Sequence, residues 1–286
     1  MRRWGTSIAL GVGFGIAVLV LITWTQMRGT PVDAWCYYGM DPANPYDPTR
    51  CFLYSPPVAQ VMTAIQPLVS FDAFYTALRT LETLALALIT GPAIGVLLVI
   101  PAVAIELNAA NINVLLVGAV LLGFRYPATW AFVILTKLTP GIGLLWFAVR
   151  REWRSFGIAA GLTVAIAALS FALAPWMWRD YVGALAGAPD ETPFKIWWRL
   201  PIAALVVIWG ARSNHRWAMI VAVFLAMPRW YFLSPVILVG LFPLVRLPRP
   251  LPMPRLALQW PARPPRASKP LPSNGSTATS IGNAVS

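Results

Sequence analysis

The sequence predicts an all-α integral membrane protein, a polytopic bundle of about ten transmembrane or half-transmembrane helices with a large first extracytoplasmic loop. Of its 286 residues, 58% are apolar and only 11% are charged, and the mean hydropathy is +0.66. These values lie outside the range of soluble globular domains. Apolar runs of full or half membrane length alternate with short clusters of Gly, Pro and Arg, as in a chain that meets the bilayer repeatedly.

The first apolar run covers residues 5–24 and is long enough to cross a bilayer. Because it is longer than the core of a signal peptide and no small-residue cleavage site follows, we expect a retained helix. A helix at the outer surface over residues 57–69 and a crossing over residues 71–89 come next. Arg79 and Glu82 lie three residues apart on that crossing, so we expect them to form an ion pair.

The middle of the chain is broken by Pro and Gly. Residues 127–149 are too short for two crossings, so we interpret them as two half-helices that meet at residues 137–140. An open alternative treats residues 127–149 and 81–105 as one crossing each, which would bury Lys137 and place Glu106 on the inner side.

The remaining helices follow from the spacing of the other apolar runs. Tryptophan is dense in the predicted loop 175–199, as at a membrane–water interface. A kink is expected at Pro101 and a break over residues 227–231. The expected helices cover residues 93–107, 111–124, 155–174, 200–210, 217–227 and 233–245.

Basic clusters predict the orientation of the chain. The net charge is +12, and many Lys and Arg residues gather near the two ends and in short turns between apolar runs, which marks the cytoplasmic side. We therefore expect a multi-pass protein of the plasma membrane, with residues 1–246 as its membrane domain, residues 28–70 outside the cell and both termini in the cytoplasm. Residues 247–286 predict a disordered, basic, Pro-rich tail. Nucleic acid is not an expected partner.

The outer loop is the one long polar stretch that carries carboxylates. Cys36 and Cys51 would close a 15-residue loop in an oxidising space, worth about 3 kcal/mol; two buried free thiols are the alternative. The same loop holds three of the ten acidic residues of the chain, Asp33, Asp41 and Asp47.

Several kinds of chemistry are excluded by what the sequence lacks. It has no Gly-rich phosphate loop between a strand and a helix and no Cys/His cluster with metal-ligand spacing. Its one histidine, His215, falls in a predicted cytoplasmic turn, which excludes Ser-His-Asp chemistry on the outer face. No cofactor is expected. Three carboxylates in one loop could hold a divalent ion, but their spacing has no metal signature.

The remaining combination indicates glycosyl transfer at the outer surface. A carboxylate can remove a proton from an acceptor hydroxyl, cations can hold a phosphate, and aromatic rings can stack on sugars. Because nucleotide sugars are made in the cytosol, an outward-facing site would take its sugar from a lipid phosphate carrier in the membrane.

Several short motifs then resemble a known family, the GT-C fold glycosyltransferases of family 87, which include polyprenyl-phosphate-mannose-dependent mannosyltransferases and related arabinofuranosyltransferases. The similarity runs from about residue 24 to residue 245. It is carried by Asp33 after the first helix and by these motifs: Asn44-Pro45-Tyr46, Phe52 to Pro57, Asn111 to Leu116, Thr136-Lys137-Leu138-Thr139-Pro140, Arg150 to Arg154 and Pro228-Arg229-Trp230-Tyr231.

The resemblance implies a GT-C-like bundle and an inverting transfer from a polyprenyl-phosphate sugar, mannose first and arabinofuranose second, to an envelope glycan or glycolipid. Asp33 would be the general base and Lys137 would contact the carrier phosphate. The other donor- or substrate-binding candidates are Tyr38, Asn44, Tyr46, Tyr54, Glu106, Asn111, Asn113, Arg229 and Tyr231.

Alternatives remain at this stage. The chain departs from the family pattern at Ala109-Ala110-Asn111, which leaves the donor contacts open, and in its short outer loop, which leaves Asp41 or Asp47 as rival bases. Glu106 either serves a ligand or bonds the neighbouring Asn side chains. A transporter or flippase for a lipid-linked or anionic solute is the alternative function, and a scaffold without catalytic activity is a third.

Overall fold

The computed structural model describes residues 32–187, 194–231 and 233–245. These residues all belong to the first of two compact units, Met1–Leu247 and Pro248–Ser286. The helix predicted at residues 5–24 and the tail predicted at residues 247–286 lie outside the described residues.

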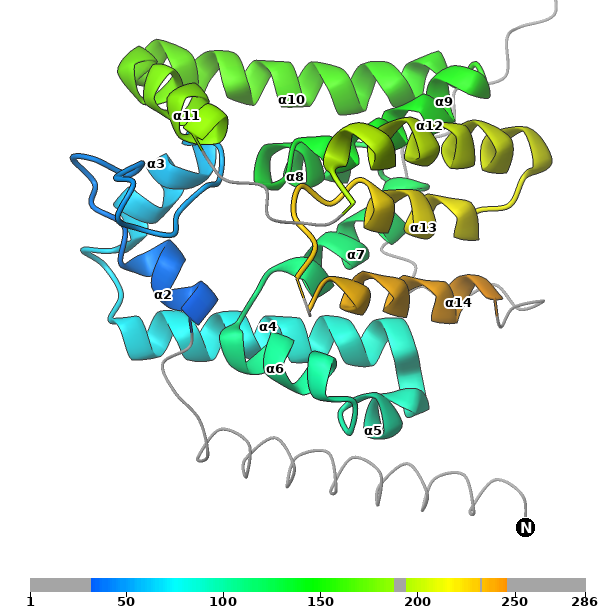
Figure 1. Ribbon diagram of the computed structural model, residues 1–286, viewed down its shortest axis with the longest axis horizontal. Coiled ribbons are helices and arrows are strands. Elements are labelled where there is room, and N and C mark those ends of the chain that lie inside the picture. Colours follow the sequence, from blue (N-terminus) through cyan, green and yellow to red (C-terminus); the bar gives the residue numbers. More distant parts are fainter. Residues whose placement is uncertain (1–31, 188–193, 232, 246–286) are drawn as a thin grey trace, which may run out of the picture. The chain divides into compact units, whose positions relative to one another are not determined.

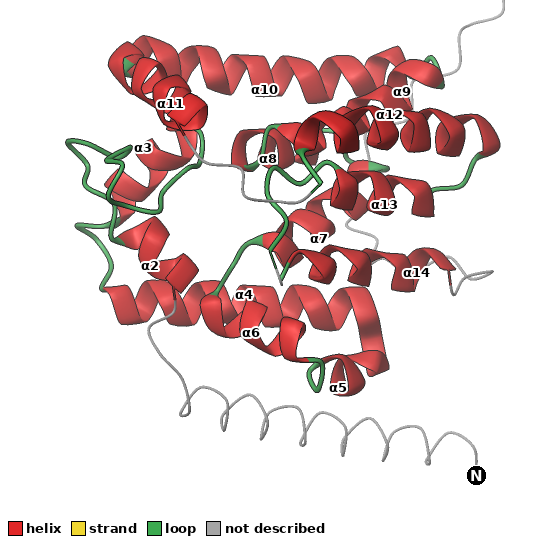
Figure 2. Cartoon of the chain, viewed as in Figure 1, coloured by secondary structure: helices red, strands yellow, loops and turns green. Residues whose placement is uncertain are grey.

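The described part of the chain is helical, as the sequence predicts (Figure 2). Its one β-type pairing is an isolated bridge between Asp41 and Asn44. Two helical segments are long and apolar enough to cross a membrane, Phe71–Leu97 and Trp153–Leu173, and a bent pair of helices would give a third span. The predicted total of about ten also counts half-length helices, and only these spans reach full length within the described residues.

The first described helices lie beside the outer loop, which is at the left edge of the view (Figure 1). Proline opens the second of them, where its fixed φ suits the first helical turn. Ser70 caps the third by accepting a hydrogen bond from the Ala73 amide at 3.3 Å. These helices are α2 (Val32–Tyr38), α3 (Pro56–Ile65) and α4 (Phe71–Thr90), followed by the 3-10 turn η1 (Gly91–Ala93) and the short α5 (Ile94–Leu97).

A sharp bend follows between α6 (Pro101–Ala109) and α7 (Asn113–Gly123), whose axes differ by 97°. Ala110 allows the bend by adopting a left-handed conformation with φ 51°. The alternative of one crossing over residues 81–105 is wrong, because the membrane-length segment is Phe71–Leu97 and the helix is broken over residues 98–100 before α6 begins.

The predicted break in the middle of the chain is confirmed. Helix α8 (Thr129–Thr136) ends before Lys137, which is extended with φ −140° and ψ 108°. The chain then continues as the 3-10 helix η2 (Thr139–Leu144) and α9 (Leu145–Val149). The alternative of one crossing over residues 127–149 is wrong, because Pro140 and its neighbours prevent α8 from continuing.

The prediction of a loop over residues 175–199 is wrong at both ends, because one helix begins at Pro175 and another at Ile196. Pro175 begins a helix, and Met177 and Tyr181, one turn apart, are buried on one face of it. The helices from here on are α10 (Trp153–Leu173), α11 (Pro175–Gly187), α12 (Ile196–Ser213), α13 (Trp217–Leu225), the 3-10 helix η3 (Ser234–Gly240) and α14 (Leu241–Val245).

Helix α7 lies in the main apolar core, where it contacts α4, α8 and η3. Trp130 of α8 is buried against two glycines that have no room for a side chain. A Cβ on Gly143 would lie 2.2 Å from the Trp130 ring, and one on Gly123 would lie 2.5 Å from its Nε1. These close approaches fix the position of α8 and hence of Lys137 at its end.

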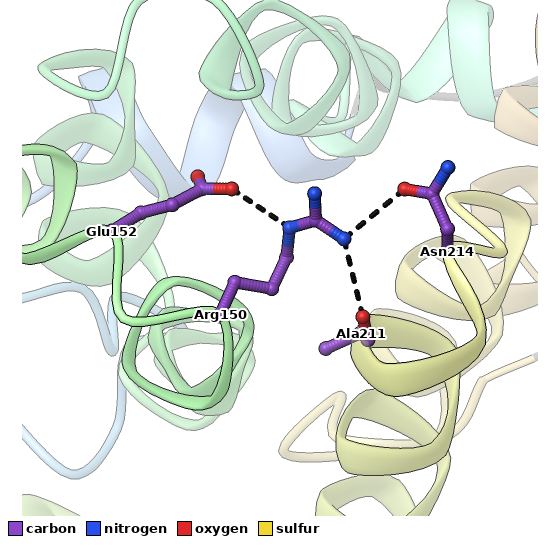
Figure 3. A network of polar contacts seen from close by, with 4 residues as sticks. All are labelled: Arg150, Glu152, Ala211 and Asn214. Atoms are coloured by element: carbon purple, nitrogen blue, oxygen red, sulfur yellow. Dashed lines mark hydrogen bonds and ion pairs between the residues drawn. The ribbon is translucent and has the colours of Figure 1, made fainter.

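Arg150 joins two turns at the end of the bundle that the charge pattern predicts to be cytoplasmic (Figure 3). Its guanidinium donates to the Glu152 carboxylate at 2.7 Å, to the Ala211 carbonyl at 3.2 Å and to the Asn214 side chain at 3.1 Å. Arg150, the first residue of the Arg150 to Arg154 motif, therefore holds the end of α9 against the end of α12.

Arg199 also has a structural role. Its side chain is fully buried in α12 and lies 4.6 Å from the centre of the Trp230 ring. Its guanidinium donates to the carbonyls of Leu225, Met227 and Pro228 at 2.7–3.2 Å. It thereby binds the carbonyl groups left free where α13 ends.

Replacement of Arg199 by Met is expected to lower the free energy of unfolding by about 3 kcal/mol or more, because several buried carbonyl groups would lose a charged donor. Thermal unfolding in detergent should show the midpoint falling by roughly 10 °C. Arg179→Met is the control, because the Arg179 side chain is 81% exposed. Equal midpoints for the two variants would contradict the structural role.

Candidate active site

Lys137 is held by a short chain of hydrogen bonds from the α6–α7 bend. Its Nζ donates to Asn113 Oδ1 at 2.6 Å, and Asn113 Nδ2 donates to Glu106 Oε2 at 3.3 Å. The bend at Ala110 brings Glu106 and Asn113 to one place although they lie on different helices. The Glu106 bond fixes the amide so that its oxygen faces the ammonium group.

Three carboxyl groups interact electrostatically with this one lysine. They come from three helices: Asp33 from the first turn of α2, Glu82 from α4 and Glu106 from α6. We call Asp33, Glu82, Glu106 and Lys137 the carboxylate–lysine cluster. Glu82 and Glu106 are fully buried, whereas Asp33 is only partly buried. Asp33 is therefore the carboxylate of the cluster that is most accessible from the surface.

The environment of Asp33 favours proton uptake. Burial raises the pKa of its carboxyl above the ordinary value, and the positive charge of Lys137 opposes that shift. A carboxylate with a raised pKa is a stronger base than an exposed one, so Asp33 is suited to accept a proton from a hydroxyl.

Two tyrosines and an asparagine border the cluster. The hydroxyls of Tyr37 and Tyr54 lie 3.0 Å apart, and Tyr37 also donates to Asn111 Oδ1 at 3.4 Å. Burial raises the pKa of both hydroxyls, so they stay neutral and able to donate. Both tyrosines also interact electrostatically with Asp33. Tyr54, Asn111 and Asn113 are thus the predicted binding residues that the structure brings to Asp33 and Lys137, together with Glu106.

Other predicted binding residues serve the loop itself. Tyr38 donates to the Val69 carbonyl at 2.8 Å and Tyr46 to the Tyr54 carbonyl at 2.8 Å. Asn44 is exposed and forms a backbone turn with Asp41. These three residues shape the outer loop, and in the described structure none of their side chains bonds to the cluster.

Arg229 and Tyr231 form a separate pair after α13. Arg229 donates to the Tyr231 hydroxyl at 3.2 Å. Within the described residues, neither side chain forms a hydrogen bond or ion pair with the carboxylate–lysine cluster. Their predicted role in donor binding therefore has no support from the geometry.

The two rival bases are turn residues. Asp41 Oδ1 accepts from the Ala43 amide at 2.9 Å, and Asp47 Oδ1 accepts from the amide and the hydroxyl of Thr49 at 2.8 and 2.7 Å. The Thr49 bonds lower the pKa of Asp47. Such short-range bonds are typical of Asx turns, and they leave Asp33 as the candidate base.

Glu82 and Tyr37 lie at the site but were not among the predicted site residues, and Glu82 had been assigned another role. The predicted ion pair with Arg79 is wrong, because Arg79 donates to the Tyr75 hydroxyl at 3.4 Å and lies over its ring. The Glu82 carboxyl instead turns inward to the cluster. An acidic residue inside a membrane-length helix was itself a signal of function, which the nearby arginine obscured.

A disulfide bond joins Cys36 of α2 to Cys51 of the outer loop, with their Cα atoms 5.3 Å apart. It ties the helix that carries Asp33 to the segment that carries Tyr54.

Replacement of both cysteines by Ser is expected to lower the free energy of unfolding by about 3 kcal/mol, the value for a closed loop of this length. The midpoint of thermal unfolding in detergent should fall by roughly 10 °C. Reduction of the native protein should produce the same fall, and the double variant should then show no further response to reductant. An unchanged midpoint in the variant would contradict this expectation.

No three His, Cys, Asp or Glu side chains lie where they could hold one metal ion, as far as the structure describes the chain. In the cluster it is the Lys137 ammonium that interacts with the three carboxyl groups.

Comparison with known proteins shows the family to which the chain belongs. No curated protein and no solved structure matches the chain. The sequence matches the family model of glycosyltransferase family 87 over residues 46–248, well over half of its length. The match covers Tyr54, Glu82, Glu106 and Lys137 and begins after Asp33. This membrane protein therefore belongs to glycosyltransferase family 87.

Proposed function

We propose that this glycosyltransferase moves a sugar from a polyprenyl-phosphate carrier to a hydroxyl of an envelope glycan or glycolipid, at the outer face of the plasma membrane and with inversion. Mannose is the favoured sugar and arabinofuranose the second. The observation that carries the proposal is the convergence of Asp33 and Lys137, which come from distant parts of the chain, in one cluster.

Lys137 supplies the cation that a phosphate needs. The donor breaks between the anomeric carbon and the phosphate oxygen, and the electron pair leaves on the phosphate. An ammonium group beside that oxygen stabilises the developing charge, more so in a site shielded from water. The Asn113 bond holds Lys137 in place before the donor arrives.

Asp33 acts on the acceptor. Its carboxylate removes the proton of the acceptor hydroxyl while the hydroxyl oxygen bonds to the anomeric carbon. Glu82 and Glu106 are fully buried, so an acceptor approaching from outside meets Asp33 first. The disulfide bond beside Asp33 fits an oxidising compartment and hence an outward-facing site.

A donor screen tests the function directly. Purified protein in proteoliposomes is given radiolabelled polyprenyl-phosphate mannose, arabinofuranose or glucose together with an extract of envelope glycolipids. Transfer of label from one of these donors to a glycolipid is expected, with mannose the most active. Movement of the labelled carrier between leaflets without any transfer would instead indicate the flippase alternative.

A further inference from the structure

Glu82 is buried in α4, and its carboxyl group forms no hydrogen bond within the described part of the chain. Its side chain is 0% exposed, and neither carboxyl oxygen has a hydrogen-bond partner among the described residues. Glu106 Oε1, also fully buried, lacks a partner there as well. Leaving a buried polar group unpaired costs free energy. Three such oxygens beside one lysine therefore point to a ligand that completes their bonding.

The side chain of Glu82 points into the protein and away from lipid. Glu82, Leu86 and Thr90 form the buried stripe of α4, each one turn from the next. Leu81, Leu84 and Leu88 on the same helix are more than half exposed. Figure 1 shows α4 running beneath α2 and beside α6, the helices that carry the other two carboxyl groups.

The groups that face Glu82 define which ligand it can bind. It interacts electrostatically with Glu106, Asp33 and Lys137, and also with the Tyr37 hydroxyl. Lys137 attracts the carrier phosphate, whereas a carboxyl group would repel it. The part of the donor that a carboxyl group can bind is therefore its sugar. A carboxylate accepts hydrogen bonds from sugar hydroxyls, and a protonated carboxyl can also donate one.

We propose that Glu82 binds hydroxyl groups of the transferred sugar and so helps to determine which sugar the enzyme accepts. Glu106 Oε1 provides a second acceptor next to it. The inference rests on the proposed function and adds a sugar-binding residue to it. A site that pairs buried polar groups with substrate hydroxyls discriminates strongly against ligands that lack them.

Binding measurements separate the sugar from its carrier. The affinities of purified wild-type protein for polyprenyl-phosphate mannose, polyprenyl-phosphate arabinofuranose and bare polyprenyl phosphate are compared with those of Glu82→Leu and Glu82→Gln. Wild type should prefer one sugar-bearing probe to the bare carrier. Glu82→Leu should weaken binding of that probe by about ten- to a hundredfold and leave binding of the bare carrier unchanged. Glu82→Gln, which keeps one acceptor and one donor group, should lose less.

Glu82→Leu is expected to fold, because it replaces an unpaired buried carboxyl with an apolar side chain of similar size. Its unfolding midpoint should equal or exceed that of wild type. Thr83→Val is the matched control, since the Thr83 hydroxyl bonds at 2.8 Å to the Arg79 carbonyl of its own helix. It should bind all three probes as wild type does.

The outcomes distinguish the two proposals. If wild type binds the bare carrier but shows no preference for either sugar, or if Glu82→Leu keeps that preference, the role of Glu82 is wrong while the donor class stands. If wild type binds none of the three probes, the proposed function itself fails, and the role of Glu82 fails with it.

Discussion

Asp33→Asn is expected to lower the rate of sugar transfer by about 10²–10⁴-fold, the range in which a general base contributes to catalysis. The amide has nearly the shape of the carboxylate but cannot accept the proton of the acceptor. Binding of polyprenyl phosphate should be unchanged, because the cation for the phosphate, Lys137, remains. Rates of transfer and carrier affinity are measured on the same proteoliposome preparation.

Asp47→Asn is the matched control, since Asp47 lies in the same loop but only forms a turn with Thr49. Its transfer rate should stay close to that of wild type. Full activity of Asp33→Asn would remove Asp33 from the mechanism. If Asp47→Asn lost activity instead, Asp47 would be the base.

The pH profile gives a second measure of the same residue. Asp33 must be ionised to act as a base, so the rate should fall as the pH drops through its pKa. Because burial raises that pKa, the fall should begin at a higher pH than for an ordinary aspartate. Lys137 holds the pKa down, whereas Glu82, Glu106, Tyr37 and Tyr54 are the other titratable groups that interact with Asp33. In a variant that lacks the Lys137 charge, the fall in rate at low pH should therefore begin at a still higher pH.

Lys137→Met is expected to reduce kcat/KM for the carrier-linked donor by about 10²–10³-fold, a loss comparable to removing one preorganised electrostatic contact to a developing anion. The substitution keeps an unbranched side chain, one atom shorter, and removes its charge. Unlike Asp33→Asn, it should also weaken binding of bare polyprenyl phosphate, which an equilibrium binding measurement detects.

Arg125→Met is the control for loss of one positive charge. Arg125 is exposed just beyond the end of α7 that lies opposite Asn113. It should leave both the transfer rate and carrier binding close to wild type. Equal carrier affinity in Lys137→Met and wild type would show that the phosphate is held elsewhere.

The parts of the fold that could be predicted are those set by local sequence. Pro140 and Gly141 predict the break beside Lys137, and the structure has it there. Asp33 and Lys137 were each singled out from motifs, but their proximity depends on the packing of α2 against α6 and on the 97° bend. No short-range pattern encodes such a long-range contact.

Other features could not be predicted because two explanations fit the same residues. Arg79 and Glu82 have the spacing of an ion pair, yet burial of one side chain and a tyrosine hydroxyl near the other separate them. The tryptophans near Pro175 indicate an interface, and an interfacial segment can be a loop or a helix. The left-handed conformation of Ala110, which directs Glu106 and Asn113 to one site, has no sequence signal because glycine usually takes that position.

The clasp formed by Arg199 has a consequence for biogenesis. Its guanidinium is enclosed by carbonyl groups of residues 225–228, which leave the ribosome after α12. Burial of an arginine that has lost these acceptors is costly. Helix α12 can therefore reach its final position only after the carbonyl groups that follow α13 have been made, so a chain that ends between the two helices should be unstable.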